Sequence, residues 1–229
     1  MSGNKGDAMN GSIRGIIFDM DNTLYNFFDA KMLACKKAAG IVGTGTGEEL
    51  LRYFLSGKHG FEDPENIRDF MTDRNVLDDS LFSEAAREYE DVKLTSIVLY
   101  PGVMDLIPAL HESGMPLTIV TDAGSLQAEQ RLTKLELHDY FQSVITPDTT
   151  GRRKPDPLNF HSAMEVMNTR PEETMIVGDS PKREIEPGNK LGLTTVYAKY
   201  GDWIKTPFPS INPDYTLEKF EDLRLLLDL

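Results

Sequence analysis

The chain has 229 residues, which is enough for one large domain or for a medium domain with a smaller companion. A hydrophobic content of 40% and a charged content of 27% are ordinary for a globular protein and exclude collagen-like, low-complexity and disulfide-dense chains. The formal net charge of −13 argues against binding to nucleic acid or to an anionic membrane, because both depend on clustered Lys and Arg.

Two further features indicate the compartment. Cys35 is the single cysteine, so it cannot form an internal disulfide and favours a reducing environment. No apolar run approaches the roughly 20 residues needed to cross a bilayer, and residues 1–11 lack the apolar core of a secretory signal. We therefore expect a cytoplasmic protein with a flexible N-terminus over residues 1–11.

The first predicted element is a buried strand at Ile13–Phe18, within an apolar run rich in isoleucine. The roughly 75 residues that follow carry helical patterns and no convincing strand. Because this insertion is too long for a simple crossover between strands, we expect residues 25–98 to form a separate helical subdomain. The glycine-rich stretch Gly43–Gly47 lacks the Lys of a phosphate-binding loop and predicts a turn inside it.

The rest of the chain alternates strands with helices. Helical patterns run from Ser125 to Phe141 and begin again at Pro157. Further apolar runs predict strands at Leu117–Val120, Ser143–Thr146, Thr174–Val177 and Thr194–Tyr197. This alternation is typical of a parallel sheet with helices on both faces. We therefore predict an α/β fold with a doubly wound, Rossmann-like core formed by residues 12–24 and 99–229, and a helical cap inserted after its first strand.

Polar residues follow four of the predicted strands. In open parallel sheets, ligands collect outside the carboxyl ends of the strands, which meet at one edge. The residues there are Asp19 and Asp21 after the first strand, Thr121 and Asp122 after the second, Lys154 after the third, and Asp179 with Glu184 after the fourth. Each alone fits a helix cap or a strand end. Together these residues predict a functional site, because polar residues placed by chance would be found at both edges of the sheet.

The carboxylates at this edge predict a bound cation. Two unit charges 4 Å apart repel by about 4 kcal/mol at an effective dielectric near 20. Asp19, Asp21 and Asp179 gathered at one point could therefore not all ionise without a cation. With only carboxylate, backbone carbonyl and water as donors, and no His or Cys cluster, Mg²⁺ is favoured over zinc. Mg²⁺ in turn suits phosphate chemistry.

Four motifs carry a resemblance to a known family. In chain order they are "DMDNT" from Asp19, "IVTD" ending at Asp122, "RRKPDP" around Lys154 and "GDSPKRE" ending at Glu184. They resemble the four motifs of the haloacid dehalogenase superfamily, and the helical insertion resembles its C1-type cap. The resemblance extends from Ile13 to about Trp203 and implies a Mg²⁺-dependent phosphatase.

The resemblance implies a role for each matched residue. Asp19 would be the nucleophile that forms an aspartyl-phosphate, and Asp21 would protonate the leaving oxygen and then deprotonate water. Thr121 and Lys154 would hold phosphoryl oxygens. The carboxylates of Asp19 and Asp179 and the backbone carbonyl of Asp21 would bind the metal.

Two positions are less clearly defined by the resemblance. Glu184 stands where the family pattern often has Asp, so we expect its longer side chain to act on a metal-bound water. Asp122 follows Thr121 at a position of variable character and is a further candidate for the phosphate-binding part of the site.

The residues bear differently on several alternative functions. Asp21 argues against a dehalogenase, because a halide needs no acid to protonate it. A phosphonatase would need a cap lysine that forms an imine, but we expect the available Lys31, Lys36 and Lys37 on solvated helix faces. A signalling receiver domain has no helical insertion of this length. A phosphomutase of the β-phosphoglucomutase type, which uses the same two aspartates, and a catalytically idle phosphate-binding module stay open.

The cap favours a small molecule over a folded protein as the partner, because a lid shields the reacting group from water. We therefore expect a small phosphorylated metabolite, with no nucleic acid or membrane partner, and a monomer or homodimer. Four basic residues of the insertion could meet a second anionic group of the substrate, although such residues are more often on the surface; they are Arg52, Lys58, His59 and Arg74.

Overall fold

The computed structural model describes residues 13–205, 208 and 210–227. The flexible N-terminus expected at residues 1–11 lies outside this part of the chain. The chain divides into two compact units, one formed by Asn26–Val98 and the other by the segments up to Tyr25 and from Leu99 onwards. Among the helices of the described residues, none is both long and apolar enough to span a membrane.

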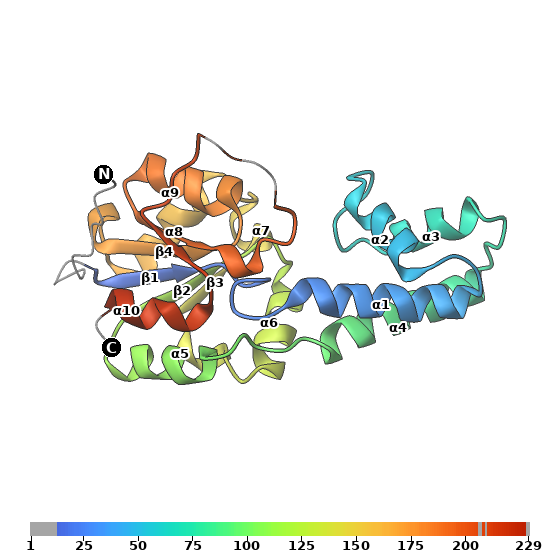
Figure 1. The fold of residues 1–229 in the computed structure, drawn as a ribbon, viewed down its shortest axis with the longest axis horizontal. Helices are drawn as coiled ribbons and strands as arrows, with labels where there is room; N and C mark the ends of the chain where they lie inside the picture. Colours follow the sequence, from blue (N-terminus) through green and yellow to red (C-terminus); the bar gives the residue numbers. More distant parts are fainter. Residues whose placement is uncertain (1–12, 206–207, 209, 228–229) are drawn as a thin grey trace. The chain divides into compact units, whose positions relative to one another are not determined.

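The larger unit contains a six-stranded parallel sheet, which confirms the predicted α/β fold (Figure 1). The strand order is β3-β2-β1-β4-β5-β6. The strands are β1 Gly15–Phe18, β2 Leu117–Val120, β3 Ser143–Ile145, β4 Thr174–Gly178, β5 Thr194–Ala198 and β6 Tyr215–Leu217. The five predicted strands are all present within a residue or two, and β6 is an additional edge strand.

The register of the central strands brings their carboxyl ends together. Phe18 of β1 lies opposite Ile119 of β2 on one side and Val177 of β4 on the other. The residues that follow these positions therefore leave the sheet at the same edge. Strands β1, β2 and β4 are buried along their whole length, as expected for a sheet covered on both faces.

Helices cover both faces of this sheet. In Figure 1, α8 and α9 lie on one face and α5 and α10 on the other. Their bounds are α5 Val103–Glu112, α6 Ser125–Lys134, α7 Pro147–Thr150, α8 Pro157–Met167, α9 Glu186–Leu191 and α10 Leu223–Leu227. Single turns complete the unit, namely η1 His138–Tyr140, η2 Pro171–Glu173, η3 Pro181–Ile185, η4 Lys199–Gly201 and η5 Phe220–Asp222.

The helix expected from Ser125 to Phe141 is shorter than predicted. It ends at Lys134 because Glu136 has a positive φ of 56°, a left-handed conformation that a helix cannot continue through. Helix α8 begins as its sequence suggests, since Asp156 accepts a hydrogen bond from the Leu158 N–H at 3.0 Å and Pro157 occupies the first turn. Its residues Phe160 and Met164 pack on the sheet.

The smaller unit is entirely helical within the described residues. It consists of α1 Phe27–Val42, α2 Gly47–Leu55, α3 Glu65–Thr72 and α4 Asp79–Thr95. Helices α1 and α4 lie side by side (Figure 1). Gly43 and Gly45 have φ of 78° and 73°, so the glycine-rich stretch forms the predicted turn between α1 and α2. This unit has its own core, which includes Phe54, Phe70 and Tyr89.

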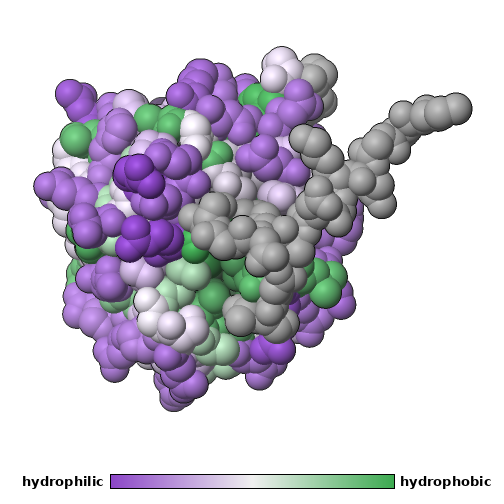
Figure 2. All heavy atoms as spheres, turned by 90° about the vertical axis from the view of Figure 1, so that its left-hand side faces the viewer, coloured by the Kyte–Doolittle hydropathy of each residue, from purple (hydrophilic) through white to green (hydrophobic). Residues whose placement is uncertain are grey.

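One face of the molecule is shown in Figure 2. Most of the described side chains on it are hydrophilic, as the composition leads us to expect, and hydrophobic side chains gather in one region of it.

Candidate active site

Three of the predicted site residues meet in a buried ion-pair cluster at the carboxyl edge of the sheet. The ammonium group of Lys154 forms an ion pair with Asp19 Oδ1 and lies 2.7 Å from Glu184 Oε1. All three side chains are at most 4% exposed. Burying a charge without a partner of opposite charge is energetically unfavourable. The three charged groups of the cluster therefore stabilise one another.

Asp19 is fixed by its position at the end of β1. Its backbone N–H donates to the Val177 carbonyl at 2.9 Å, which continues the pairing of β1 with β4. Its second carboxylate oxygen accepts a hydrogen bond from the Thr23 hydroxyl at 2.7 Å. Both oxygens of Asp19 therefore have defined partners, and the side chain has little freedom to rotate. Thr23 lies within the "DMDNT" motif, but no role was predicted for it.

Lys154 is kept charged by its surroundings. Burial lowers the pKa of its ammonium group, but the negative charges of Asp19 and Glu184 outweigh this effect and raise the pKa above its usual value. The ammonium group also donates to the Val120 carbonyl at 3.1 Å. It is therefore a permanent cation facing the Asp19 carboxylate.

Asp179 is buried with one oxygen poorly satisfied. Among the described residues, no group donates a hydrogen bond to its Oδ1 atom, and Arg183 Nη2 lies 3.6 Å away. Burial, followed by the negative charges of Asp19 and Glu184, raises the pKa of Asp179 well above its usual value. This oxygen is placed where an additional positive charge would be strongly stabilising.

Glu184 is directed at Lys154 by the local backbone. It lies in the π-helical turn η3, and its Oε2 atom accepts a hydrogen bond from the Ser180 N–H at 2.9 Å. A Cβ atom on Gly178 would lie 2.4 Å from Glu184 Cγ, so the glycine of "GDSP" makes room for the longer side chain. Burial raises the pKa of Glu184, and the ammonium group of Lys154 opposes that rise.

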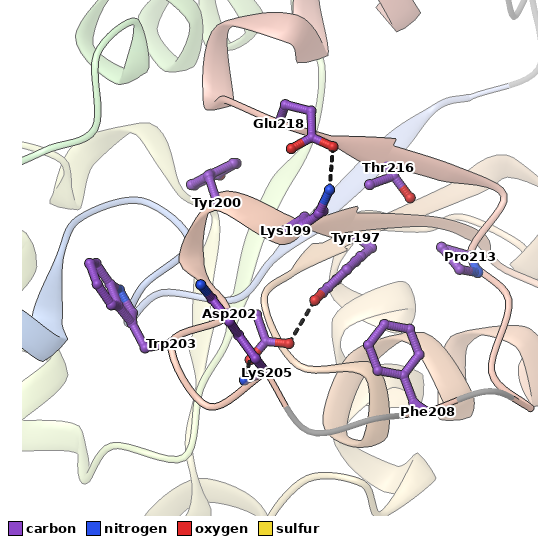
Figure 3. Close-up of a pocket in the computed structure, with 10 residues that line it drawn as sticks. All are labelled: Tyr197, Lys199, Tyr200, Asp202, Trp203, Lys205, Phe208, Pro213, Thr216 and Glu218. Carbon is purple, nitrogen blue, oxygen red and sulfur yellow. Dashed lines mark hydrogen bonds and ion pairs between the residues drawn. The ribbon is translucent and has the colours of Figure 1, made fainter.

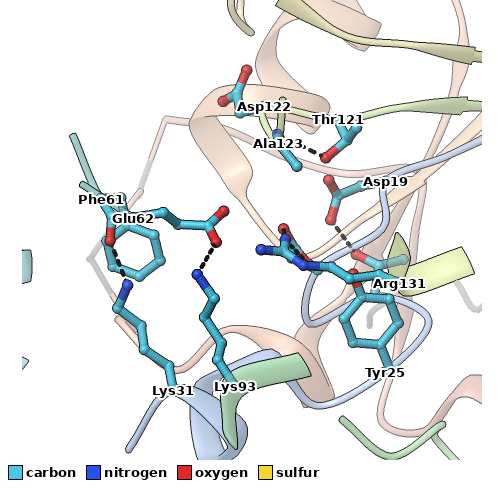
Figure 4. A network of polar contacts seen from close by, with 12 residues as sticks. Asp19, Tyr25, Lys31, Phe61, Glu62, Lys93, Thr121, Asp122, Ala123 and Arg131 are labelled. Atoms are coloured by element: carbon cyan, nitrogen blue, oxygen red, sulfur yellow. Dashed lines mark hydrogen bonds and ion pairs between the residues drawn. The ribbon is translucent and has the colours of Figure 1, made fainter. Parts of the chain in front are cut away.

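Thr121 and Asp122 lie at the end of β2 but make different contacts. The Thr121 hydroxyl accepts a hydrogen bond from the Ala123 N–H at 3.1 Å and stands next to Asp19 in Figure 4. Asp122 instead binds the loop of Lys154: its Oδ1 atom accepts from the Lys154 N–H at 2.9 Å, and its backbone carbonyl accepts from Arg153 at 2.7 Å. These contacts of Asp122 support the loop that delivers Lys154.

Asp21 is held by residues outside the Lys154 cluster. Arg131 Nη1 lies 2.9 Å from one of its carboxylate oxygens and 3.0 Å from the other, and the Tyr25 hydroxyl donates to Oδ1 at 2.5 Å. Arg131 belongs to α6 and stands beside Tyr25 in Figure 4. Arg131 is not predictable from the sequence, because nothing local distinguishes it from the other basic residues of a polar helix.

The donors at this edge fit the predicted Mg²⁺. Within the described ranges, no group of three or more His, Cys, Asp or Glu side chains is arranged to hold a metal. The predicted set needs only two such side chains, Asp19 and Asp179, together with the backbone carbonyl of Asp21. All of these donors are oxygens, which Mg²⁺ prefers, and the poorly satisfied Oδ1 of Asp179 is a fitting ligand atom.

The helical unit corrects one expectation about its lysines. Lys36 and Lys37 are about half exposed, but Lys31 is fully buried. Its ammonium group donates to the Phe61 carbonyl (Figure 4) and lies 3.8 Å from the centre of the Phe61 ring and 4.3 Å from that of Phe54. Lys31 is buried because aromatic rings and a carbonyl replace water around its charge.

The basic residues proposed for a second anionic group have structural contacts of their own. Arg74 is partly exposed, and its Nη2 atom lies 2.9 Å from Glu49 Oε2. Lys58 and His59 both contact Asp69, at 2.5 and 2.9 Å. Arg52 is exposed.

A separate pocket of about 820 Å³ lies at the ends of β5 and β6 (Figure 3). The Tyr197 hydroxyl donates to Asp202 at 2.6 Å and Lys199 lies 2.6 Å from Glu218 on its wall. The described residues that line this pocket include none of the predicted site residues.

The fold and the site together define a class of protein. It has a parallel α/β core with a helical insertion after the first strand. At the carboxyl edge of its sheet lie a buried aspartate, a lysine and a second aspartate that follows another strand. Residues 16–198 match the model of the haloacid dehalogenase-like hydrolases, so the chain belongs to that family. The family expected from the four motifs is therefore confirmed.

Curated relatives match along nearly their whole length. The chain is 28% identical over 224 residues to the glyceraldehyde 3-phosphate phosphatase of Methanocaldococcus jannaschii, with 92% of this chain and 95% of that protein covered. It is 29% identical over 226 residues to the phosphoglycolate phosphatase of Aquifex aeolicus, with 94% and 97% covered.

Solved structures agree with the fold. The magnesium-bound structure of YfnB from Bacillus subtilis has a TM-score of 0.75 at 24% identity, with 96% of this chain and all of that chain covered. The structure of a phosphatase of the same family from Thermococcus onnurineus has a TM-score of 0.67 at 21% identity, with 94% and 98% covered.

Proposed function

We propose that this protein is a Mg²⁺-dependent phosphatase that hydrolyses a small phosphorylated metabolite through an aspartyl-phosphate on Asp19. The observation that carries the proposal is the buried Asp19 carboxylate, whose two oxygens are held by Lys154 and by Thr23 at the carboxyl edge of the sheet. A carboxylate fixed in this way is prepared for in-line attack on phosphorus.

The first half of the reaction transfers the phosphoryl group to the enzyme. An oxygen of Asp19 forms a bond to phosphorus, the bond from phosphorus to the leaving oxygen breaks, and Asp21 gives its proton to that oxygen. In the second half, Asp21 takes a proton from water, the water oxygen attacks phosphorus, and the bond to Asp19 breaks. Free phosphate leaves and Asp19 is restored.

The remaining residues stabilise the negative charge of the phosphoryl group. The ammonium group of Lys154 reduces the repulsion between Asp19 and an anionic substrate, and the Thr121 hydroxyl can donate to a phosphoryl oxygen. Asp19, Asp179 and the Asp21 carbonyl would hold Mg²⁺, which would neutralise phosphoryl oxygens when bound. Glu184 holds Lys154 in place and, when the metal is bound, would act on a metal-bound water.

The helical unit Asn26–Val98 is proposed to serve as the cap that excludes water during the reaction. The relatives are named for glyceraldehyde 3-phosphate and phosphoglycolate, both small molecules, which supports a small substrate here. A cytoplasmic location and a monomeric or homodimeric state remain predictions from the sequence.

The test is phosphate release from a panel of phosphorylated sugars, nucleotides, short acids and an aryl phosphate, with and without Mg²⁺. We expect Mg²⁺-dependent turnover that falls by at least about 10³-fold in Asp19→Asn, since the nucleophile is lost. Asp139→Asn, on the exposed η1 turn, is the matched control. Near-normal turnover in Asp19→Asn would contradict the assignment.

The same panel separates the alternatives. A phosphomutase would convert a sugar phosphate to its isomer without releasing a stoichiometric amount of phosphate. An idle module would bind a phosphorylated compound, measured by a shift in melting temperature, without consuming it.

A further inference from the structure

Arg131 is a buried arginine on a helix that is otherwise mostly polar. It is 2% exposed and lies on the face of α6 that also buries Ala128 and Leu132. Taking a guanidinium group out of water is costly unless its charge is paired. The burial of Arg131 therefore requires an anionic partner at that place in the fold.

The carboxylate of Asp21, which is 110 residues away in the sequence, is such a partner. A single guanidinium nitrogen, Nη1, lies 2.9 and 3.0 Å from the two oxygens of Asp21 and so bridges them. The Tyr25 hydroxyl donates to Oδ1 at 2.5 Å, and residues 21 and 25 also pair through their backbones. These contacts restrict rotation of the Asp21 carboxylate about both of its side-chain torsions.

The pair is asymmetric in its access to solvent. The Arg131 side chain is 2% exposed, whereas that of Asp21 is 22% exposed. The cation is therefore enclosed by protein, while part of the Asp21 side chain is accessible to solvent. A group that exchanges protons with a bound molecule needs this combination of a fixed orientation and an accessible side.

We propose that Arg131 is a positioning residue for Asp21, which holds the carboxylate in the orientation that proton transfer requires. The proposal rests on the proposed function, because it takes Asp21 to be the acid and base. Arg131 itself exchanges no proton and touches no reacting atom. Its effect on the rate should therefore pass through Asp21.

The experiment compares Arg131→Met, Arg131→Lys and the matched control Lys134→Met, an exposed lysine of the same helix. In Arg131→Met we expect kcat to fall about 10²-fold for alkyl phosphates and about tenfold for aryl phosphates, whose leaving groups need less help from an acid. KM should change less than threefold. Arg131→Lys keeps the charge and should recover part of the loss, and Lys134→Met should match the wild type.

The second arm is a double-mutant cycle. If Arg131 acts through Asp21, adding Arg131→Met to Asp21→Asn should lower kcat no further than Asp21→Asn alone. Circular dichroism and the melting temperature of each variant show whether it is folded, and Arg131→Lys supplies the test if Arg131→Met is not.

The outcomes separate this proposal from the proposed function. An active wild type with equal losses for alkyl and aryl phosphates, or with additive losses in the cycle, would overturn the positioning role alone. A wild type that turns over no phosphate ester in the panel would overturn the proposed function, and the role of Arg131 with it.

Discussion

The backbone of Gly201 lies against the backbone carbonyl of Asn22 so closely that a Cβ atom on residue 201 would lie 1.8 Å from the carbonyl oxygen. The same Cβ would lie 3.2 Å from the Cβ of Asp179. In addition, the hydroxyl of Tyr200 donates to the Thr23 carbonyl at 2.7 Å. The turn after β5 thus supports the loop that carries Asp21 and the end of β4.

Gly201→Ala should therefore damage the site. Because the clash is with backbone, the Asn22 peptide or the whole turn must move, and overpacking of this kind costs about 1–3 kcal/mol or more. We expect a lower melting temperature and a loss of phosphatase activity larger than the loss of folded protein explains. The control is Gly40→Ala in α1, where a Cβ meets nothing within 4 Å and a helical alanine should be neutral or slightly stabilising.

Lys154→Met should destabilise the protein more than loss of an ordinary ion pair would. It leaves Asp19 and Glu184 buried without their shared cation, and breaking a buried pair costs about 3–5 kcal/mol. Urea denaturation in the presence of EDTA measures this loss. The matched control is Lys190→Met, whose ion pair with Glu186 at 2.6 Å is mostly exposed and should contribute about 1 kcal/mol or less. Equal losses of unfolding free energy in the two variants would show that the buried cluster contributes no more to stability than an exposed ion pair does.

The sequence was sufficient for the sheet because parallel strands are buried on both faces and read as continuous apolar runs. Strand β6 was missed because it has only three residues, at the edge of the sheet, of which Thr216 is exposed. The helical pattern continues beyond the true end of α6 because no strong sequence signal marks the left-handed conformation of Glu136.

The site residues that directly follow strands were predictable from the sequence. The side chains that contact them from other elements of the fold were not. The meeting of Lys154 with Asp19 follows from the topology, since both leave the sheet at the same edge. The pairing of Arg131 with Asp21 depends on which face of α6 is buried, and the polar sequence of that helix does not define this. Lys31 was misjudged for the same reason: its aromatic surroundings come from separate segments of the helical unit.

Mg²⁺ should raise the melting temperature of the wild type and not that of Asp179→Asn. A ligand that binds only the folded state stabilises it by about 2.7 kcal/mol at a concentration 100 times its Kd, and Asp179 supplies one of the two proposed carboxylate ligands. Thermal melts at rising Mg²⁺, reversed by EDTA, measure the shift. Asp139→Asn, which changes an exposed carboxylate, should respond as the wild type does. An equal shift in Asp179→Asn would remove that residue from the metal site.

Cys35 should make the stability of the protein fall at alkaline pH. Burial raises the pKa of its thiol from 9.0 to about 12, an effect that Lys31 and Lys93 only partly oppose. Between these values the unfolded chain loses the thiol proton while the folded chain keeps it, so the free energy of unfolding should decrease as pH rises, by up to about 1.4 kcal/mol per pH unit. Urea denaturation from pH 8 to pH 10.5 measures the slope. Other groups also titrate there, so the comparison is with Cys35→Ala, which should show a shallower slope because it lacks this thiol. Equal slopes would mean that the thiol ionises as readily in the folded chain as in the unfolded one.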